Sequence, residues 1–488
     1  NPENRYKTAL GVLNDLELCL QNLNQEQLIK LFPLAEKDFS DKLVFSQKLY
    51  GRDAEVTALL NAFSLIEKTK RSQLCVIRGY SGVGKSRLVK EIYKPVTQQD
   101  SYFIAGKFEQ YKKSTAYFAL INALTELVEQ ILGESEEQLT HWSNVLQDGL
   151  GINCQMVIDF IPEFGLIIGE QQSISEDVLP KEQLRFDLVM IKLFQVLSQQ
   201  NKSITIFLDD MQWADLATIQ FIQAIIEQDN INNLFFLISY RDNEVEETHP
   251  LSHLIEIANT SPSGYHRLEL LPLNNQGITS FIADSLEVCE DEIQSLVSII
   301  IDKTAGNPFF VIEFIKSLKE KNILYKDNNN HWQWNLSSLK ALTSTDNVAE
   351  LMTQRIERLS EQCKEILHVA SCIGSTVDTS LLSRVISLKK VLFEHDLQLL
   401  VDEGYIVAFS NSTNIDSIDY IKFTHDRIQQ AAYLLKNATP IAQVHYRIAC
   451  DYLLQNNQSH EGNQDHEDNI FDYVEHMNLS AQLFIEVK

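Results

Sequence analysis

Residues 79–86 have the types and spacing that bind phosphate. They read GYSGVGKS and fit the pattern G-x-x-x-x-G-K-[ST]. An apolar run at 74–77 precedes them, and a helix-like run at 87–93 follows. A turn between a strand and a helix lets backbone N–H groups and the helix N-terminus converge on phosphate oxygens. The pattern therefore predicts a binding site for ATP or GTP.

A second motif carries two adjacent carboxylates. The run 204–208 is continuously apolar, as strands of a parallel sheet covered on both faces are, and Asp209 and Asp210 follow it. Ligands of such sheets collect at the carboxyl ends of the strands. We expect Asp209 to hold Mg²⁺ through water with the Ser86 hydroxyl as an inner ligand, and Asp210 to orient or polarise the attacking water. Asp215 fits either a functional carboxylate or a cap of the next helix.

These motifs need a sheet to position them. Strand-like runs separated by helical stretches favour an α/β fold with a mainly parallel sheet and right-handed crossovers. The predicted strands lie at residues 74–77, 102–105, 204–208, 234–239 and 267–271. A mostly helical insertion, at about residues 110–200, separates the second strand from the third.

The other segments are mostly helical in pattern. Apolar spacing predicts amphipathic helices at residues 1–24, 52–66, 277–320 with a break at 306–308, 441–454, and from 470 onward. Trp332 and Trp334 lie in a hairpin-like stretch. Two strand-like runs, 405–409 and 420–423, follow a compact helical unit and have the outline of a winged helix. After a polar, acidic linker at 460–468, a larger helical array is expected to start.

Composition and charge limit the function classes. The chain has 488 residues, of which 44% are hydrophobic, and a formal net charge of −26. This length suggests about three domains. The acidic charge opposes nucleic acid, so we expect no nucleic-acid partner. No apolar stretch approaches the ~18 residues of a membrane span, and the seven cysteines lack C-x-x-C spacing, so a cytoplasmic protein without a membrane span is expected.

Several segments together resemble one protein family. They are 50–53 (YGRD), the phosphate loop, 208–215 (LDDMQWAD), 240–245 (YRDNEV), 306–310 (GNPFF) and 423–426 (FTHD). The chain resembles the STAND class of AAA+-related signalling ATPases over about residues 45–440. More narrowly, it is similar to the ATPase module of bacterial hybrid sensor kinases, in which a serine/threonine kinase domain precedes the ATPase, and sensor and histidine-kinase domains follow it.

The resemblance implies a P-loop NTPase with a parallel five-stranded sheet, followed by a helical lid, a winged-helix domain and the start of an α-helical, repeat-like domain. The predicted domains are a kinase tail with its linker at 1–45, the ATPase at 46–275, the lid at 276–340, the winged helix at 341–438 and the helical arm at 439–488. An independent amphipathic helix is the alternative for the N-terminal segment. No kinase motif occurs in the chain, which we expect to be a piece of a longer kinase.

The resemblance also implies roles at the phosphates. Lys85 would neutralise the β- and γ-phosphates, and Gly82 and Gly84 would let the backbone approach them. Arg241, after the fourth strand, resembles the arginine that senses the γ-phosphate; a surface ion pair is the alternative. The other loop residues expected to bind nucleotide are Gly79, Ser81, Val83, Ser86 and Arg87.

Four further matches concern the nucleoside and the closed state. Tyr50 and Arg52 resemble the segment that cradles adenine and ribose in this class. Pro308 resembles a lid proline that packs on the nucleotide; an ordinary helix-interrupting turn is the alternative. His425 resembles the winged-helix histidine that reaches the β-phosphate of ADP, although a lone histidine in this position also fits a structural role.

The implied function is an ATP/ADP-binding signalling switch. ADP would hold the module closed through Pro308 and His425, and exchange for ATP would favour an open form that self-associates and regulates attached kinase and sensor domains. Many related ATPases have glutamate in place of Asp210, so the shorter side chain predicts slow, Mg²⁺-dependent hydrolysis. The alternatives are a nucleotide-stabilised scaffold that does not hydrolyse ATP, and a DNA-replication or transcription ATPase, which the acidity disfavours.

Overall fold

The structure is a computed structural model of the chain. It describes residues 9–26, 32, 34, 43, 45–46, 48–109, 116–169, 171, 182–200, 202–228, 230–259, 264–327, 331–341, 355–374, 376–386, 390–409, 418–435, 439–458 and 466–481. The chain forms two compact units, and each is described by itself. The first comprises Asn1–Asp53 with Pro272–Leu351, and the second comprises Ala54–Leu271 with Met352–Lys488.

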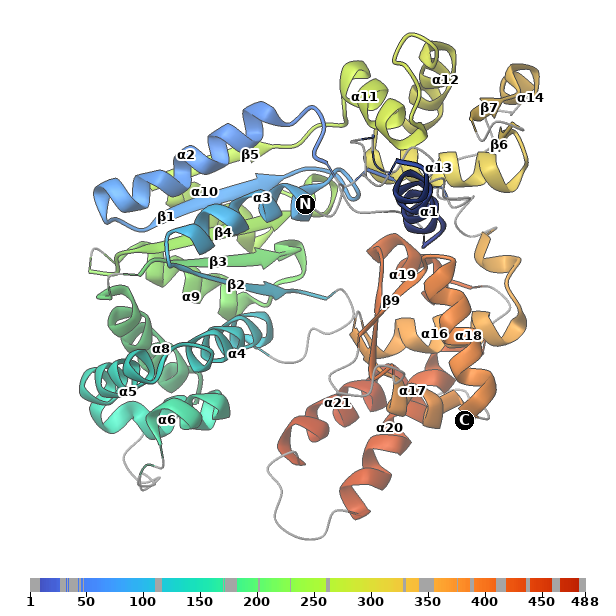
Figure 1. The fold of residues 1–488 in the computed structure, drawn as a ribbon. Helices are drawn as coiled ribbons and strands as arrows, with labels where there is room; N and C mark the ends of the chain where they lie inside the picture. Colours follow the sequence, from blue (N-terminus) through green and yellow to red (C-terminus); the bar gives the residue numbers. More distant parts are fainter. Residues whose placement is uncertain are drawn as a thin grey trace. The chain divides into compact units, whose positions relative to one another are not determined.

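The second unit contains the predicted parallel sheet of five strands. Its order is β2-β3-β4-β1-β5, and every neighbouring pair is parallel (Figure 1). The strands are β1 Gln73–Arg78, β2 Tyr102–Lys107, β3 Ile204–Asp209, β4 Leu234–Tyr240 and β5 Gly264–Glu269. The phosphate loop follows β1, and Asp209 ends β3. The strands β3, β4 and β1 are neighbours and run parallel, so their carboxyl ends lie on the same side of the sheet. Both motifs therefore lie at these carboxyl ends, close to each other.

The fifth strand departs from its predicted position. It starts at Gly264 and ends at Glu269, whereas the apolar pattern predicted 267–271. The reason is that β5 lies at the edge of the sheet beside β1, and its side chains are half-buried or exposed. Its sequence therefore lacks the continuous apolar run of a central strand. The two apolar residues that follow the strand, Leu270 and Leu271, shifted the predicted range towards the C-terminus.

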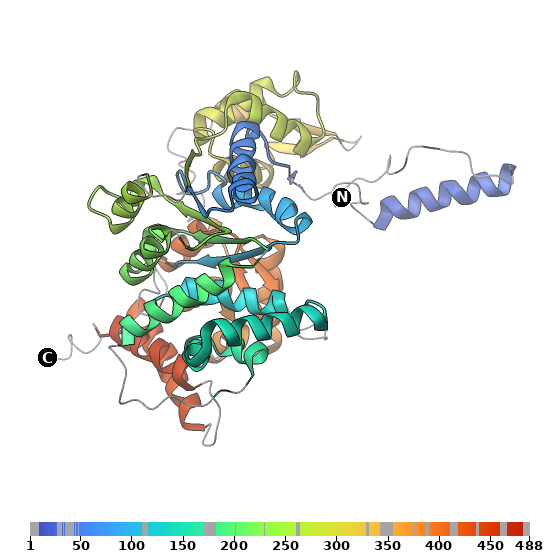
Figure 2. The ribbon, with the colours of Figure 1, turned by 90° about the vertical axis from the view of Figure 1, so that its left-hand side faces the viewer.

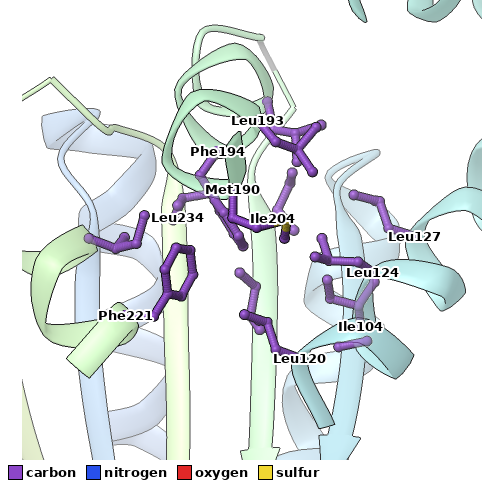
Figure 3. Packing of buried hydrophobic residues seen from close by; sticks show 14 of the residues in the cluster. Ile104, Leu120, Leu124, Leu127, Met190, Leu193, Phe194, Ile204, Phe221 and Leu234 are labelled. Atoms are coloured by element: carbon purple, nitrogen blue, oxygen red, sulfur yellow. The ribbon is translucent and has the colours of Figure 1, made fainter. Parts of the chain in front are cut away.

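The insertion between β2 and β3 is mostly helical, as predicted, in its described residues. Its helices are α4 Phe118–Leu132, α5 Glu136–Leu150, α6 Cys154–Phe160, α7 Gly165–Ile168 and α8 Glu182–Ser198. Both ribbon views place them together beside β2 and β3 (Figures 1 and 2). Leucines of α4 and Met190 and Phe194 of α8 converge on Ile104 and Ile204 of the sheet (Figure 3). The insertion thus shares one hydrophobic core with the sheet.

Further helices of this unit are α2 Asp53–Thr69, α3 Lys85–Gln98, α9 Leu216–Ile226 and α10 Pro250–Ala258. Two of them, α2 and α3, contact the sheet through aromatic side chains. Phe63 of α2 lies 5.9 Å from Phe235 of β4, measured between ring centroids. Tyr93 of α3 lies 5.2 Å from Phe103 of β2. Helix α3 begins earlier than the predicted 87–93 and continues beyond it, so Lys85 and Ser86 form its first turn.

The C-terminal part of the same unit is helical around a small antiparallel sheet of order β8-β10-β9. Its elements are α16 Glu361–Ile373, β8 Thr376–Asp378, α17 Thr379–Ile386, α18 Lys390–Asp402, β9 Ile406–Phe409, β10 Tyr420–Phe423 and α19 Asp426–Tyr433. The predicted pairing of the two strand-like runs is confirmed, with Ile421 opposite Ala408. The turn-rich segment 410–416 lies outside the described residues. The assignment as a winged helix stays a prediction.

Two long helices follow, α20 Ile441–Gln458 and α21 His466–Leu479. Helix α21 starts before the predicted residue 470, so the linker prediction of 460–468 is wrong at its C-terminal end. Residues 459–465 lie outside the described part of the chain. The two helices meet at His445 and His476, whose Nδ1 atoms are 2.7 Å apart. Whether this pair begins a helical array stays a prediction.

The first unit is built mainly of helices. They are α1 Ala9–Glu26, α11 Asn275–Leu286, α12 Gln294–Thr304, α13 Pro308–Glu320 and α14 Leu336–Ala341. The predicted hairpin at the two tryptophans is present as β6 Leu324–Lys326 paired with β7 Trp332–Trp334. Ile282, Phe314 and Trp332 belong to its hydrophobic core.

Helix length and hydropathy give no single membrane-spanning candidate among the described residues. In this described part of the chain, α12 and α13 satisfy both criteria when taken together, and they meet at a bend of 118°.

Candidate functional site

The phosphate loop joins β1 to α3 through glycines in conformations that other residues rarely adopt. The φ angles of Gly79, Gly82 and Gly84 are 154°, 80° and 103°. A Cβ atom on Gly79 would lie 2.6 Å from the carbonyl oxygen of Leu270, closer than any real contact. Gly84 is the N-cap of α3, so the N–H groups of the first helical turn face the loop.

Lys85 is the first residue of α3, at the end of this loop, and its side chain is buried. Its Nζ atom donates to the carbonyl oxygens of Gly79 at 2.9 Å and Tyr80 at 3.2 Å. Burial lowers the pKa of Lys85, and the charges of Asp210 and Asp209 oppose this shift. The ammonium group is thus aimed into the loop, as binding of phosphate requires.

Ser86 and Asp209 form the candidate Mg²⁺ site. The Ser86 hydroxyl donates to Oδ2 of Asp209 at 2.8 Å. The other carboxylate oxygen, Oδ1, accepts hydrogen bonds from the Ser239 hydroxyl and, at 3.1 Å, from the backbone N–H of Asp210. Among the described residues, no group of three or more His, Cys, Asp or Glu side chains could hold a metal. A hydroxyl and a carboxylate nevertheless fit Mg²⁺, because it keeps waters and phosphate oxygens as its other ligands.

Asp210 is buried, and its carboxylate contacts several polar side chains. Its backbone is left-handed, with φ at 59°. Oδ1 accepts from Gln212 Nε2 at 2.9 Å and Arg241 Nε at 3.2 Å, and Oδ2 lies 3.4 Å from Lys107 Nζ. Burial raises the pKa of Asp210 to about 6, with Asp209 and Asp426 adding to the effect and the two cations opposing it.

Arg241 follows β4 and connects three carboxylates. Its Nε, Nη1 and Nη2 atoms lie 3.2, 3.0 and 2.8 Å from Asp210, Glu244 and Asp426 respectively. The guanidinium carbon also lies 4.3 Å from the centroid of the Trp213 ring. The Arg241 side chain is only 4% exposed. Arg241 therefore does form ion pairs, as the alternative prediction had it, but its guanidinium is buried and not on the surface.

His425 and Asp426 bring the C-terminal part of the unit to this network. His425 caps α19, because its Nδ1 accepts the backbone N–H of Arg427 at 3.1 Å. Burial lowers the pKa of His425 to about 4. Asp426, the first residue of α19, lies 2.6 Å from Lys107 Nζ through its Oδ1. Burial alone would raise the pKa of Asp426, but Lys107, His425 and Arg241 together hold it below its usual range.

The structure therefore brings Lys85, Ser86, Asp209, Asp210 and Arg241 to one edge of the sheet. Ser81 and Val83 are buried in the loop, whereas Arg87 pairs with Glu91 along α3 at 2.8 Å. Asp215 has the capping role: its carboxylate accepts the backbone N–H of Thr218 at 2.8 Å at the start of α9.

Three predicted residues belong to the first unit, so their relation to the phosphate loop stays a prediction. The Tyr50 hydroxyl contacts Ser46 and Asp284, each at 2.7 Å, and burial raises its pKa to about 12. Arg52 is buried. Pro308 is the first residue of α13, which Asn307 caps.

Sequence reasoning missed several members of the site, which are Lys107, Gln212, Trp213, Ser239 and Asp426. Lys107 lies beyond the predicted end of its strand at 105, yet it is the register partner of Asp209. Asp426 directly follows the predicted His425. Adjacency to a predicted residue was the available signal for Asp426, but it does not show which side chains meet, and Lys107 had no such signal.

Comparisons with known proteins show what this chain is similar to. Residues 48–238 match the family described as "AAA ATPase domain". The chain is 26% identical to hybrid signal transduction histidine kinase G of Dictyostelium discoideum, over 92% of this chain and 16% of that protein. It is 22% identical to the peroxide stress-activated histidine kinase mak3 of Schizosaccharomyces pombe, over 98% and 23%. The chain thus spans under a quarter of either relative, and the similarity extends beyond the bacterial proteins named above.

A solved structure from Pyrococcus horikoshii, described as a STAND protein with a tetratricopeptide repeat sensor, shows a weaker likeness. It is 13% identical with a TM-score of 0.46, over 91% of this chain and 50% of that chain.

Proposed function

We propose that the AAA ATPase domain carried by this chain is an ATP/ADP-binding signalling switch that hydrolyses ATP slowly with Mg²⁺. One observation carries the proposal. Arg241 bonds both to Asp210, beside the candidate metal ligand, and to Asp426, the first residue of α19. The residue that we propose to respond to nucleotide therefore also holds an element outside the sheet.

Different residues of the loop and of the carboxyl ends of the strands would bind the phosphates, bind Mg²⁺ and orient water. Lys85 and the first N–H groups of α3 would hold the phosphates, while Ser86 and Asp209 would hold Mg²⁺, which neutralises phosphate charge when bound. Ser239 keeps the Asp209 carboxylate oriented. Asp210 would orient water, but Gln212, Arg241 and Lys107 already contact its carboxylate oxygens, which leaves less room for water to bind there and supports slow turnover.

The proposal extends to the nucleotide and to partners. Tyr50 and Arg52 would cradle adenine and ribose, and Pro308 and His425 would contact ADP in the closed form. Because the two relatives are histidine kinases much longer than this chain, we propose attached kinase and sensor domains as partners. Release of α19 would expose surface for self-association.

The test compares the full chain with Mg²⁺ and either ADP or the β,γ-imido analogue of ATP. Sedimentation velocity should give larger species with the analogue, and phosphate release from ATP should stay well below ~1 per second, at the slow end of enzymes. Equal sedimentation with both nucleotides would contradict the switch. Nucleotide binding with no phosphate release at all would favour the scaffold alternative.

A further inference from the structure

Lys107 and Arg241 hold one carboxylate between them. Lys107 Nζ lies 2.6 Å from Oδ1 of Asp426, and Arg241 Nη2 lies 2.8 Å from Oδ2. The two cations come from opposite sides of β3, because Lys107 ends β2 and Arg241 follows β4. Each oxygen of Asp426 therefore has its own cation, an arrangement that would also suit a phosphate group with several charged oxygens.

Departure of Asp426 alone is unfavourable. It would remove the nearest partner of Lys107 and free one N–H group of a guanidinium that is 4% exposed. Lys107 would keep its longer contact with Asp210, at 3.4 Å. Breaking a buried ion pair is costly when one charge is left without compensation. The carboxylate is thus released readily only when another anion takes its place.

The position of the two cations indicates which anion this is. Lys107 is the register partner of Asp209, the candidate Mg²⁺ ligand, and Arg241 bonds the adjacent Asp210. The cations therefore flank the part of the site where the terminal phosphate of a nucleotide would lie. A diphosphate lacks that group and leaves the Asp426 contact intact.

We infer that Lys107 is a specificity residue of the nucleotide site, and that it and Arg241 bind one anion at a time, either the Asp426 carboxylate or the terminal phosphate of a nucleoside triphosphate. This inference rests on the proposed function. Since Asp426 is the first residue of α19, exchange of the two anions couples the type of nucleotide to the position of that helix.

The test measures the dissociation constants of ADP and of the β,γ-imido analogue of ATP, with Mg²⁺, for variants of the full chain. Asp426→Asn keeps the shape of the side chain but removes its charge. It should tighten binding of the analogue by about tenfold and leave ADP nearly unchanged, a coupling of ordinary allosteric size. Lys107→Met should weaken the analogue by about tenfold with little effect on ADP, and Lys107→Arg should retain the preference.

Lys202 provides a matched control. Its Nζ lies 2.6 Å from Glu134, and its side chain is 19% exposed, so it resembles Lys107 in pairing and burial. It precedes β3 and therefore belongs to the opposite end of the sheet. Lys202→Met should leave the ratio of the two dissociation constants unchanged.

Three outcomes are possible. A changed ratio in Asp426→Asn and Lys107→Met, in opposite directions, supports the inference. An unchanged ratio in both, with wild-type binding of both nucleotides, overturns the inference alone. Failure of the wild-type chain to bind either nucleotide overturns the proposed function and this inference with it.

Discussion

The Ser86 hydroxyl lies 2.8 Å from Oδ2 of Asp209, although the two residues are 123 positions apart in the sequence. The strand order explains this contact, because the loop after β1 and the end of β3 are separated only by β4. Both oxygens are of the kind that Mg²⁺ prefers. The contact is the geometric basis for proposing Mg²⁺-dependent chemistry at this edge of the sheet.

Ser239→Ala should impair the metal site without removing a predicted ligand. The Ser239 hydroxyl donates to Oδ1 of Asp209, so its loss leaves the carboxylate held by fewer hydrogen bonds and less firmly oriented. We expect the Mg²⁺ concentration for half-maximal phosphate release to rise by about tenfold, as is common when a partner of a metal ligand is removed.

Thr205→Val is the control for that variant. Thr205 is fully buried in the neighbouring strand β3, and its hydroxyl has no hydrogen-bond partner among the described residues. Its replacement should leave the Mg²⁺ dependence unchanged. An equal effect of both substitutions would show that Ser239 acts through packing only.

Gly79→Ala should destabilise the protein through its backbone. The added Cβ atom would lie 2.6 Å from the Leu270 carbonyl oxygen, and the φ angle of 154° disfavours any side chain. We expect a loss of about 1–3 kcal/mol in the free energy of unfolding, measured in urea. Gly133→Ala is the control, because its Cβ would meet nothing closer than 3.4 Å. Equal stability of the two variants would contradict the steric argument.

The sequence predicted the elements of this site better than their mutual contacts. The loop at 79–86 and the carboxylates after β3 were predictable because each depends on a local pattern next to an apolar strand. Contacts of Ser239, Lys107 and Asp426 depend instead on strand order and register, which no local pattern specifies. Lys107 was missed for a further reason: a lysine at the end of β2 interrupts the apolar signal, so the predicted strand ended at 105.

Asp215→Ala tests whether this carboxylate is only structural. It caps α9 through the backbone N–H and hydroxyl of Thr218, at 2.8 and 2.6 Å. We expect about 1 kcal/mol lower stability, with phosphate release per folded molecule unchanged. Asp215→Asn should recover most of the stability, because asparagine also caps helices. A loss of turnover in both variants, with normal stability, would assign Asp215 a functional role.

The histidine pair of α20 and α21 should make stability depend on pH. Burial, aided by His368, lowers the pKa of His445 from 6.5 to about 4. Between these values the unfolded chain binds a proton that the folded chain does not. The contribution to stability is therefore complete above the unfolded pKa and is lost as pH falls towards the folded one, by about 2 kcal/mol between about pH 7.5 and about pH 5.

Urea unfolding at those two pH values checks this expectation. His445→Asn keeps an acceptor near Nδ1 but cannot take up a proton, so its stability should change less with pH than that of the wild type. His253→Asn replaces an exposed histidine and should behave like the wild type. The same pH dependence in His445→Asn and the wild type would exclude the pair as its source.

The central claim is that Lys85, Ser86 and Asp209 bind a Mg²⁺–nucleotide complex, and calorimetric titration of ATP with Mg²⁺ into the full chain tests it most directly. We predict saturable binding at one site, weakened at least about tenfold in Lys85→Ala, as loss of a charged hydrogen-bond donor to phosphate implies. Lys90→Ala, an exposed lysine on the same helix, should bind as the wild type does. Absence of ATP binding by the folded wild-type chain, or equal affinity in Lys85→Ala, would contradict the account.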